Sequence, residues 1–176
     1  MNNIYVIGVF GVGKTTLSKL LSKEKNKNLI SLDFIRWSIY EKIGYDFNYI
    51  EQLVKRKKFI DLYRYNSKFE IELVKETIMN TSDTVIDFGA GHSIIESEST
   101  FNYIRKLMKE RGITIFLDKK IISNHTNLHP EEKFLNNYFL ASKCNQKLSD
   151  ITVMIDNKNK SQILNEVLNK LESFEK

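Results

Sequence analysis

A glycine-rich segment directly follows the first apolar run of the chain. Residues 4–7 are apolar, and residues 8–16 read Gly-Val-Phe-Gly-Val-Gly-Lys-Thr-Thr. Glycines at the first and sixth places, followed by lysine and threonine, form the pattern of a phosphate-binding loop. Because a strand must lead into such a loop and a helix must follow it, the segment predicts an α/β fold with a strand at the start of the chain.

Each residue type in this segment suits phosphate binding. Gly8, Gly11 and Gly13 can adopt positive φ, so successive backbone N–H groups can turn toward a phosphate. We expect Lys14 to lie along the β- and γ-phosphates and the Thr15 hydroxyl to bind Mg²⁺. The alternative is a glycine-rich turn that binds nothing. The expected nucleotide-binding residues are Gly8, Gly11, Val12, Gly13, Lys14, Thr15 and Thr16.

Apolar runs alternate with helical patterns along the rest of the chain. Further strands are expected at residues 29–32, 84–88, 113–117 and 151–155. This alternation is typical of a three-layer α/β structure with a mainly parallel sheet. The chain has 176 residues, one proline and no Gly/Ser linker, so we expect a single domain over residues 1–176.

Two helical blocks without a strand between them interrupt the alternation. They are expected at residues 49–65 and 68–80, and Ser67 and Glu70 have the spacing of a capping box for the second block. We expect this insertion, at about residues 45–80, to bind the substrate.

Several residues are expected to begin or end helices. Asp33 is placed to cap the helix after the second strand, Gly112 to end the helix before the fourth, and Ser161 to cap the last helix. The segment after the fourth strand has no firm period and contains Pro130, and we expect a lid at about residues 118–137.

Charge and composition narrow the class of protein. The net charge of +5 would suit a nucleic-acid-binding protein, but a nucleotide-binding protein also needs positive charge, so nucleic acid is not the expected partner. The basic residues 55–58 are interpreted as a solvated helix face.

His125 and His129 could bind a metal on a helix, but no third ligand is identifiable. Cys144 is the only cysteine and is interpreted as a buried thiol. With no apolar run of about 18 to 20 residues and no signal peptide, we expect a cytoplasmic protein without a membrane partner.

Polar residues follow two of the expected strands at their carboxyl ends, where ligands of parallel sheets bind. Asp87 could hold Mg²⁺ directly or through water, and the alternative is a cap of the following turn. Asp33 could accept the proton of an acceptor hydroxyl, while Arg36 could bind a carboxylate or phosphate of that acceptor. The alternative for Asp33 and Arg36 is a helix cap with an ion pair one turn apart.

A glycine-rich turn follows the third expected strand. Gly89, Ala90 and Gly91 would let a substrate approach the backbone closely, and His92 could hydrogen-bond to that substrate. A single histidine after a strand can instead be a structural donor.

These motifs occur in the order found in one known family. The loop at residues 8–16, Asp33 with Arg36, and the glycine turn together resemble the shikimate-kinase-like branch of P-loop small-molecule kinases. Residues 31–37 and 85–93 look closer still to a bacterial group of P-loop proteins that carry the label shikimate kinase or ATPase.

The resemblance implies an ATP- and Mg²⁺-dependent kinase with a five-stranded sheet of order 2-3-1-4-5, a helical binding insertion, Asp33 as the ligand of the acceptor hydroxyl, and Gly89, Ala90 and Gly91 as the substrate-binding turn. The sequence departs from the family pattern at two points. Ser31 occupies the earlier of the two aspartate positions of the family, and no arginine follows Arg111 to act from a lid. The lysines that could supply charge there are Lys119, Lys120, Lys133 and Lys143.

The leading hypothesis is transfer of the γ-phosphoryl group of ATP to a hydroxyl of a small, anionic metabolite. Lys14, Asp33 and Asp87 are the expected catalytic residues, and the chain is expected to be a monomer or a homodimer.

Two alternatives belong to other functional classes. The first is an ATP-binding switch or binding module that has no phosphoryl acceptor. A regulatory GTPase is a poorer match, because the motif that reads guanine ends in an aspartate, which residues 157–160 lack. A nucleoside or polynucleotide 5′-hydroxyl kinase is the other, and it depends on the basic insertion with Tyr49, Tyr63 and Tyr65.

Overall fold

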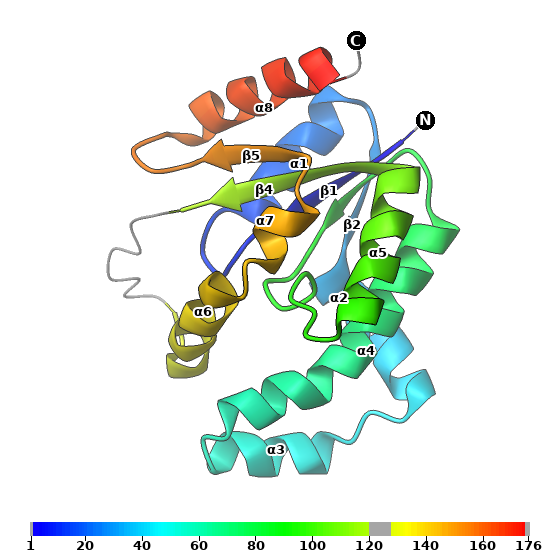
Figure 1. Ribbon diagram of the computed structural model, residues 1–176, viewed down its shortest axis with the longest axis vertical. Helices are drawn as coiled ribbons and strands as arrows, with labels where there is room; N and C mark the ends of the chain where they lie inside the picture. Colours follow the sequence, from blue (N-terminus) through cyan, green and yellow to red (C-terminus); the bar gives the residue numbers. More distant parts are fainter. Residues whose placement is uncertain (1, 120–127, 175–176) are drawn as a thin grey trace.

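The computed structural model describes residues 2–119 and 128–174. At its centre lies a five-stranded parallel sheet in the order β2-β3-β1-β4-β5 (Figure 1). This order confirms the α/β fold predicted above. The strands are β1 (Asn3–Ile7), β2 (Asn28–Ser31), β3 (Thr84–Asp87), β4 (Gly112–Asp118) and β5 (Ile151–Met154).

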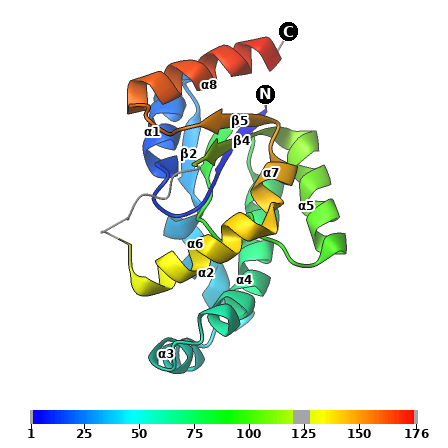
Figure 2. The ribbon, with the colours of Figure 1, turned by 60° about the vertical axis from the view of Figure 1, so that its left-hand side comes forward.

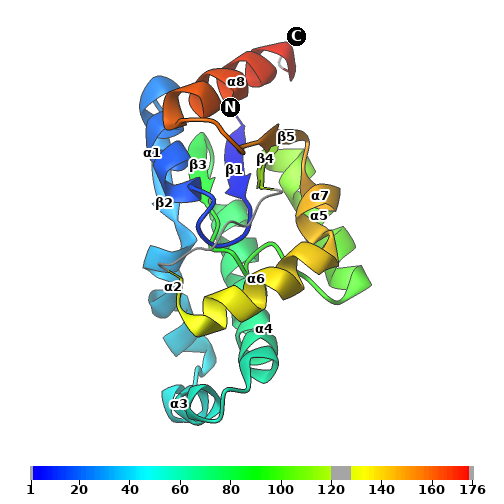
Figure 3. The ribbon, with the colours of Figure 1, turned by 90° about the vertical axis from the view of Figure 1, so that its left-hand side faces the viewer.

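Helices cover both faces of the sheet, because each connection between parallel strands crosses one face. The helices are α1 (Lys14–Glu24), α2 (Leu32–Tyr40), α3 (Phe47–Lys55), α4 (Phe59–Asn80), α5 (Glu98–Arg111), α6 (Pro130–Ser142), α7 (Cys144–Leu148) and α8 (Lys160–Phe174), with a 3₁₀ turn η1 (Glu41–Ile43). Helices α1 and α8 pack together on one face, while α5 and α7 contact β4 from the other (Figures 1 and 3). None of the helices within the described residues is both long and apolar enough to cross a membrane.

The core forms around β1, whose residues Ile4 to Ile7 are at most 3% exposed. Its register pairs Val6 with Asp87 of β3 and Ile7 with Phe116 of β4. The carboxyl ends of these strands therefore meet at one edge of the sheet. The segments that follow β1, β2 and β3 lie together at this edge.

Gly112 is the C-cap of α5, which ends at Arg111, as predicted. It is the first residue of β4, and its φ of 179° is extended. A Cβ at this position would lie 2.3 Å from the carbonyl oxygen of Asn3 on β1. Glycine is needed here because the two strand backbones approach closely.

The predicted boundary between the two helical blocks was wrong. The chain breaks at residues 56–58, where Lys57 has a φ of 53°, and α4 then runs without interruption for 22 residues. Ser67 and Glu70 lie inside this helix and form no capping box. The apolar stripe of the helix, which includes Leu62 and Phe69, continues through the predicted break, so burial favours one long helix. Helix α3 and the first half of α4 extend beyond the sheet (Figures 1 and 2).

Two predicted helix caps lie two residues from the true ones, which are Ser31 for α2 and Asn159 for α8. Helix α2 begins at Leu32, so Asp33 is in its first turn, where a carboxylate still faces the positive end of the helix. Asn159 caps α8 in place of Ser161, because its Oδ1 accepts hydrogen bonds from the N–H groups of Ser161 and Gln162, each at 3.0 Å.

Residues 120–127 of the predicted lid, with Lys120 and His125, lie outside the described residues. In the described part, Pro130 begins α6, and the backbone N–H of His129 donates to Glu132 Oε2 at 2.8 Å. Cys144 is buried as predicted, and its Sγ donates to the carbonyl of Ile95 at 3.6 Å.

Candidate active site

The segment after β1 has the backbone of a phosphate-binding loop. Gly11 and Gly13 adopt the left-handed φ values of 73° and 89° that the pattern requires, and α1 begins at Lys14. Gly8 fits tightly, since a Cβ there would lie 3.0 Å from the carbonyl oxygen of Leu117. Val12 is buried beneath the loop, whereas Gly11, Gly13, Thr15 and Thr16 are exposed on it.

Lys14 folds back over this loop. Its Nζ donates a hydrogen bond to the carbonyl oxygen of Val9 at 2.9 Å, and the side chain is 9% exposed. Burial lowers the pKa of Lys14 to about 8, although Asp87 and Asp33 oppose the shift. A buried ammonium close to exposed backbone N–H groups suits an anionic ligand that would compensate its lost hydration.

Thr15 and Asp87 form a pair at the edge of the sheet. The Thr15 hydroxyl donates to Asp87 Oδ2 at 2.7 Å. Asp87 Oδ1 is buried and has no hydrogen-bond partner among the described residues, and burial raises the pKa of this carboxyl. A hydroxyl oxygen beside an unpaired carboxylate oxygen is a donor set that fits Mg²⁺.

A cavity of about 330 Å³ opens beside the loop. Phe10 of the loop lines it, together with side chains from α2, α3, α4, α6 and the glycine turn. Five of the predicted site residues line this cavity: Asp33, Arg36, Ala90, Gly91 and His92. The sequence interpretation missed Glu70, Asn66, Glu131 and Glu132 and the aromatic walls formed by Trp37, Tyr40, Tyr45, Tyr63 and Phe139.

Asp33 and Arg36 form an ion pair along α2 and also face the cavity. Arg36 Nη1 lies 3.6 Å from Asp33 Oδ1, so the ion pair along the helix is present, and both side chains line the cavity. The guanidinium carbon of Arg36 lies 4.4 Å from the ring centroid of Trp37. Its Nε is buried without a hydrogen-bond partner among the described residues. The pair is therefore available to a ligand.

The glycine turn lets three side chains of the candidate site converge. A Cβ on Gly89 would lie 2.4 Å from His92 Nδ1 and 2.5 Å from Asp33 Oδ1, and a Cβ on Gly91 would lie 3.1 Å from Glu70 Oε2. The absence of side chains thus makes room for other protein groups as well as for a ligand. Of the four residues of this turn, Gly89 alone does not line the cavity.

His92 is buried, and neither ring nitrogen has a hydrogen-bond partner among the described residues. Burial lowers its pKa to about 4, although Asp33 opposes the shift. His92 is therefore neutral at pH 7, with one nitrogen able to donate and one able to accept.

Glu70 was missed because its spacing from Ser67 suggested a cap. It lies on α4 at helical spacing from Tyr63 and Asn66, and all three line the cavity. Burial raises the pKa of Glu70 to about 8, Asp33 adds to the rise and Arg36 opposes it. A carboxylate in line with Tyr63 and Asn66 on one helix face is the signal that could have identified it.

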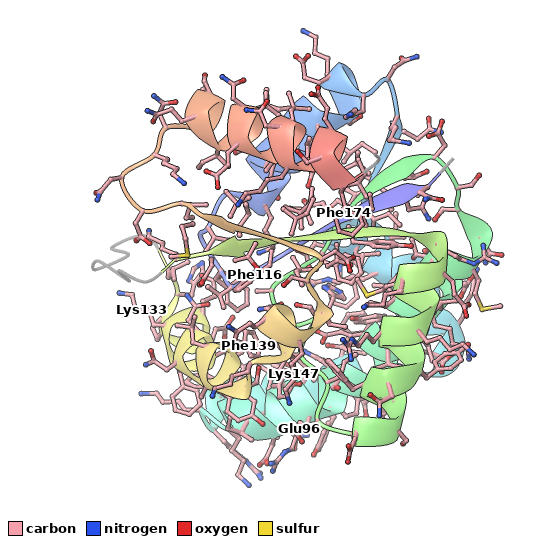
Figure 4. The ribbon with its side chains drawn as sticks, turned by 45° about the horizontal axis from the view of Figure 1, so that its top comes forward. Glu96, Phe116, Lys133, Phe139, Lys147 and Phe174 are labelled. Carbon is pink, nitrogen blue, oxygen red and sulfur yellow. The ribbon has the colours of Figure 1, made fainter. Side chains whose placement is uncertain are left out.

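Helix α6 connects the loop with the cavity. The backbone N–H of Phe10 donates to Asn136 Oδ1 at 2.9 Å, and Asn136 is 2% exposed. The Phe10 ring stacks on Phe139 at 5.9 Å between centroids. Figure 4 shows Phe139 directed toward the body of the molecule and Lys133 directed outward. Lys133 and Lys143, two of the lysines considered for the lid, are exposed.

Two of the three tyrosines considered for stacking on nucleic-acid bases, Tyr63 and Tyr65, use their hydroxyls within the protein, and the third, Tyr49, is exposed. The Tyr63 hydroxyl donates to the carbonyl of Ile94 at 2.7 Å, and the Tyr65 hydroxyl accepts from the N–H of Asp46 at 2.8 Å. Tyr49 packs against Tyr65 at 5.0 Å between centroids. This arrangement gives no support to a polynucleotide site.

Comparison with known proteins is consistent with this geometry. The sequence model of the family described as shikimate kinase matches residues 10–172. A shikimate kinase of Sulfurihydrogenibium sp. (strain YO3AOP1) is 28% identical, over 97% of this chain and 98% of its own length. A shikimate kinase of Persephonella marina is 27% identical, over 97% of this chain and 99% of its own length.

Solved structures give the same result. The shikimate kinase of Aquifex aeolicus aligns with a TM-score of 0.66 at 26% identity, covering 97% of this chain and 96% of its own. The shikimate kinase of Acinetobacter baumannii in complex with shikimate aligns with a TM-score of 0.68 at 18% identity, covering 98% and 94%, and this likeness shows the fold. From the sequence match over nearly its whole length, the chain belongs to the shikimate kinase family, whose members are ATP-dependent kinases of small molecules.

Proposed function

We propose that Lys14, Asp33 and Asp87 carry out transfer of the γ-phosphoryl group of ATP to a hydroxyl of a small molecule bound in the cavity. One observation carries this proposal: the cavity with Asp33 lies directly beside the phosphate loop, and Phe10 belongs to both. A donor phosphate on the loop and an acceptor in the cavity would be neighbours, as in-line transfer requires.

Each group has a role that its surroundings support. The exposed N–H groups of the loop bind the phosphates, and Lys14 exchanges its bond to Val9 for the transferring phosphoryl oxygens. Asp33 accepts a hydrogen bond from the acceptor hydroxyl and orients it toward the donor. His92 is neutral and hydrogen-bonds to the acceptor from the far side of the glycine turn.

Thr15 and Asp87 would hold Mg²⁺. When bound, this ion supplies positive charge to the β- and γ-phosphates. The unpaired Oδ1 of Asp87 supports the assignment, because a buried carboxylate oxygen without a partner is costly unless a ligand satisfies it.

Arg36 supports one further detail, which is that the acceptor carries an anionic group. Its buried, unpartnered Nε and its fork of N–H donors suit a carboxylate or phosphate. The nearby Asp33 carboxylate already neutralises part of the positive charge of Arg36.

The test is a screen of hydroxylated metabolites for acceptor-dependent release of ADP. Wild type is compared with Lys14→Ala and with Lys23→Ala, which removes an exposed lysine from the last turn of the same helix. We expect acceptor-dependent turnover in wild type and in Lys23→Ala, and a loss of about 10²- to 10³-fold in Lys14→Ala. If no acceptor raises ADP release above the rate of Lys14→Ala, the proposal fails.

A further inference from the structure

The cavity beside the phosphate loop carries more negative than positive charge. Four carboxylates line it, those of Asp33, Glu70, Glu131 and Glu132, against the single guanidinium of Arg36. Glu132 is engaged with the start of α6, and Asp33 lies beside Arg36. Among the described residues, neither Glu70 nor Glu131 has an ion-pair partner within 4.0 Å, and of these two only Glu70 has a buried carboxyl oxygen without a hydrogen-bond partner.

Glu70 is deep in the cavity, in the middle of a long helix. Its carboxylate lies against the Gly91 backbone, where a Cβ would approach Oε2 to 3.1 Å. Oε2 is buried and has no hydrogen-bond partner among the described residues. Polar groups that lose water without gaining a partner destabilise the fold, so such a group inside a ligand cavity points to a ligand that donates a hydrogen bond.

The walls around Glu70 are aromatic. Tyr40 and Tyr63 are buried and line the same cavity as Glu70, whose charge adds to the rise of both their pKa values. Trp37 and Tyr45 complete this side of the cavity. Ring faces attract cations and give no compensation to an anion.

Together these observations lead us to propose that the phosphoryl acceptor carries a protonated amino group, which Glu70 binds by a charge-assisted hydrogen bond while the hydroxyl faces Asp33. This inference depends on the proposed function, because it concerns the acceptor of that reaction. It is compatible with an anionic group on Arg36, since an amino-hydroxy acid would satisfy both. It disfavours acceptors whose only charge is negative.

Trp37 provides a direct measurement. It is the only tryptophan of the chain, and it lines the cavity, so its fluorescence reports occupancy without ATP. We would titrate two probes of matched shape, trans-4-aminocyclohexanol and trans-4-hydroxycyclohexanecarboxylate, at about pH 8.5, where Glu70 is charged and the amine still protonated. The amine is expected to bind at least about tenfold more tightly, as one charge-assisted hydrogen bond allows.

The variant Glu70→Gln keeps the shape of the side chain and removes its charge. It is expected to bring the two affinities to within about threefold of each other. The matched control is Glu76→Gln, which changes an exposed carboxylate on the same helix and should retain the preference. A carboxylate probe that binds as tightly as the amine, no binding of the amine at about 10 mM, or an unchanged preference in Glu70→Gln would each overturn the inference.

The outcome is separate from that of the proposed function. Selective binding of the amine can fail while ADP release still depends on an acceptor and on Lys14. Phosphoryl transfer can also fail while Glu70 still selects the amine. The two experiments therefore reject different statements.

Discussion

The phosphate loop and the cavity proposed for the acceptor differ in the groups that they offer to a ligand. The loop consists of consecutive residues and presents mainly backbone N–H groups, with Lys14 as its one buried charge. The cavity consists of side chains from four helices and a turn that are far apart in the sequence. A loop of this kind binds any nucleotide tail with the right charge, whereas a cavity of this kind can be changed one side chain at a time without loss of the loop. Within one family, acceptor choice can therefore change while the phosphoryl donor stays the same.

The largest effect is expected on the loop side. Asp87→Asn keeps the hydrogen bond from Thr15 but removes the charge proposed to hold Mg²⁺, so kcat/KM should fall by about 10²-fold or more, and saturation should need more Mg²⁺. The measurement is acceptor-dependent ADP release across a Mg²⁺ titration. The control is the binding of the cyclohexane probes, which should not change. Full activity at wild-type Mg²⁺ concentrations would remove Asp87 from the proposed site.

A smaller effect, confined to the cavity, is expected from Gly89→Ala. The added methyl group would collide with His92 and with Asp33 Oδ1, so at least one of these side chains must move. The affinity for the acceptor should fall by about tenfold, because a displaced Asp33 no longer meets the hydroxyl. Calorimetric titration with ATP and Mg²⁺ should give nearly the wild-type affinity. Equal losses for ATP and for the acceptor would show that the two regions are not independent.

The smallest effect concerns stability and pH. The pKa of Glu70 is raised in the folded state, so its contribution to stability is present in full at low pH and is lost as pH rises toward about 8. The groups that face it are Asp33, Arg36 and Tyr40 from α2, Tyr63 from its own helix, and Glu131 and Glu132 from α6. Urea unfolding should show Glu70→Gln gaining roughly 1–2 kcal/mol on wild type between pH 5 and pH 6.5. The same difference at both pH values would mean that Glu70 is adequately solvated.

The two regions also differ in how far they could be predicted. The loop, Thr15 and Asp87 were identified because a local pattern with defined flanks specifies them. Asp33, Arg36 and the glycine turn were placed together because parallel strands end at the same edge of a sheet.

Glu70 and Asn136 could not be identified in that way. Each lies on a helix whose docking depends on contacts with distant segments, such as that of Asn136 with Phe10. For Glu70 the local spacing from Ser67 favoured a cap, but continuous burial of one face of α4 decided otherwise. Gly112 shows the same effect: it was predicted as the end of a helix, but the feature that requires a glycine there is the close contact with the Asn3 backbone.

The side-chain amide of Asn136 has a consequence for the order of events. It holds the main chain of Phe10 from a helix that also walls the acceptor cavity. A molecule that shifts α6 on entering the cavity must also displace the Phe10 backbone, which precedes Gly11 in the phosphate loop. Binding of either substrate should therefore change the affinity for the other. In Asn136→Ala the two affinities should become independent.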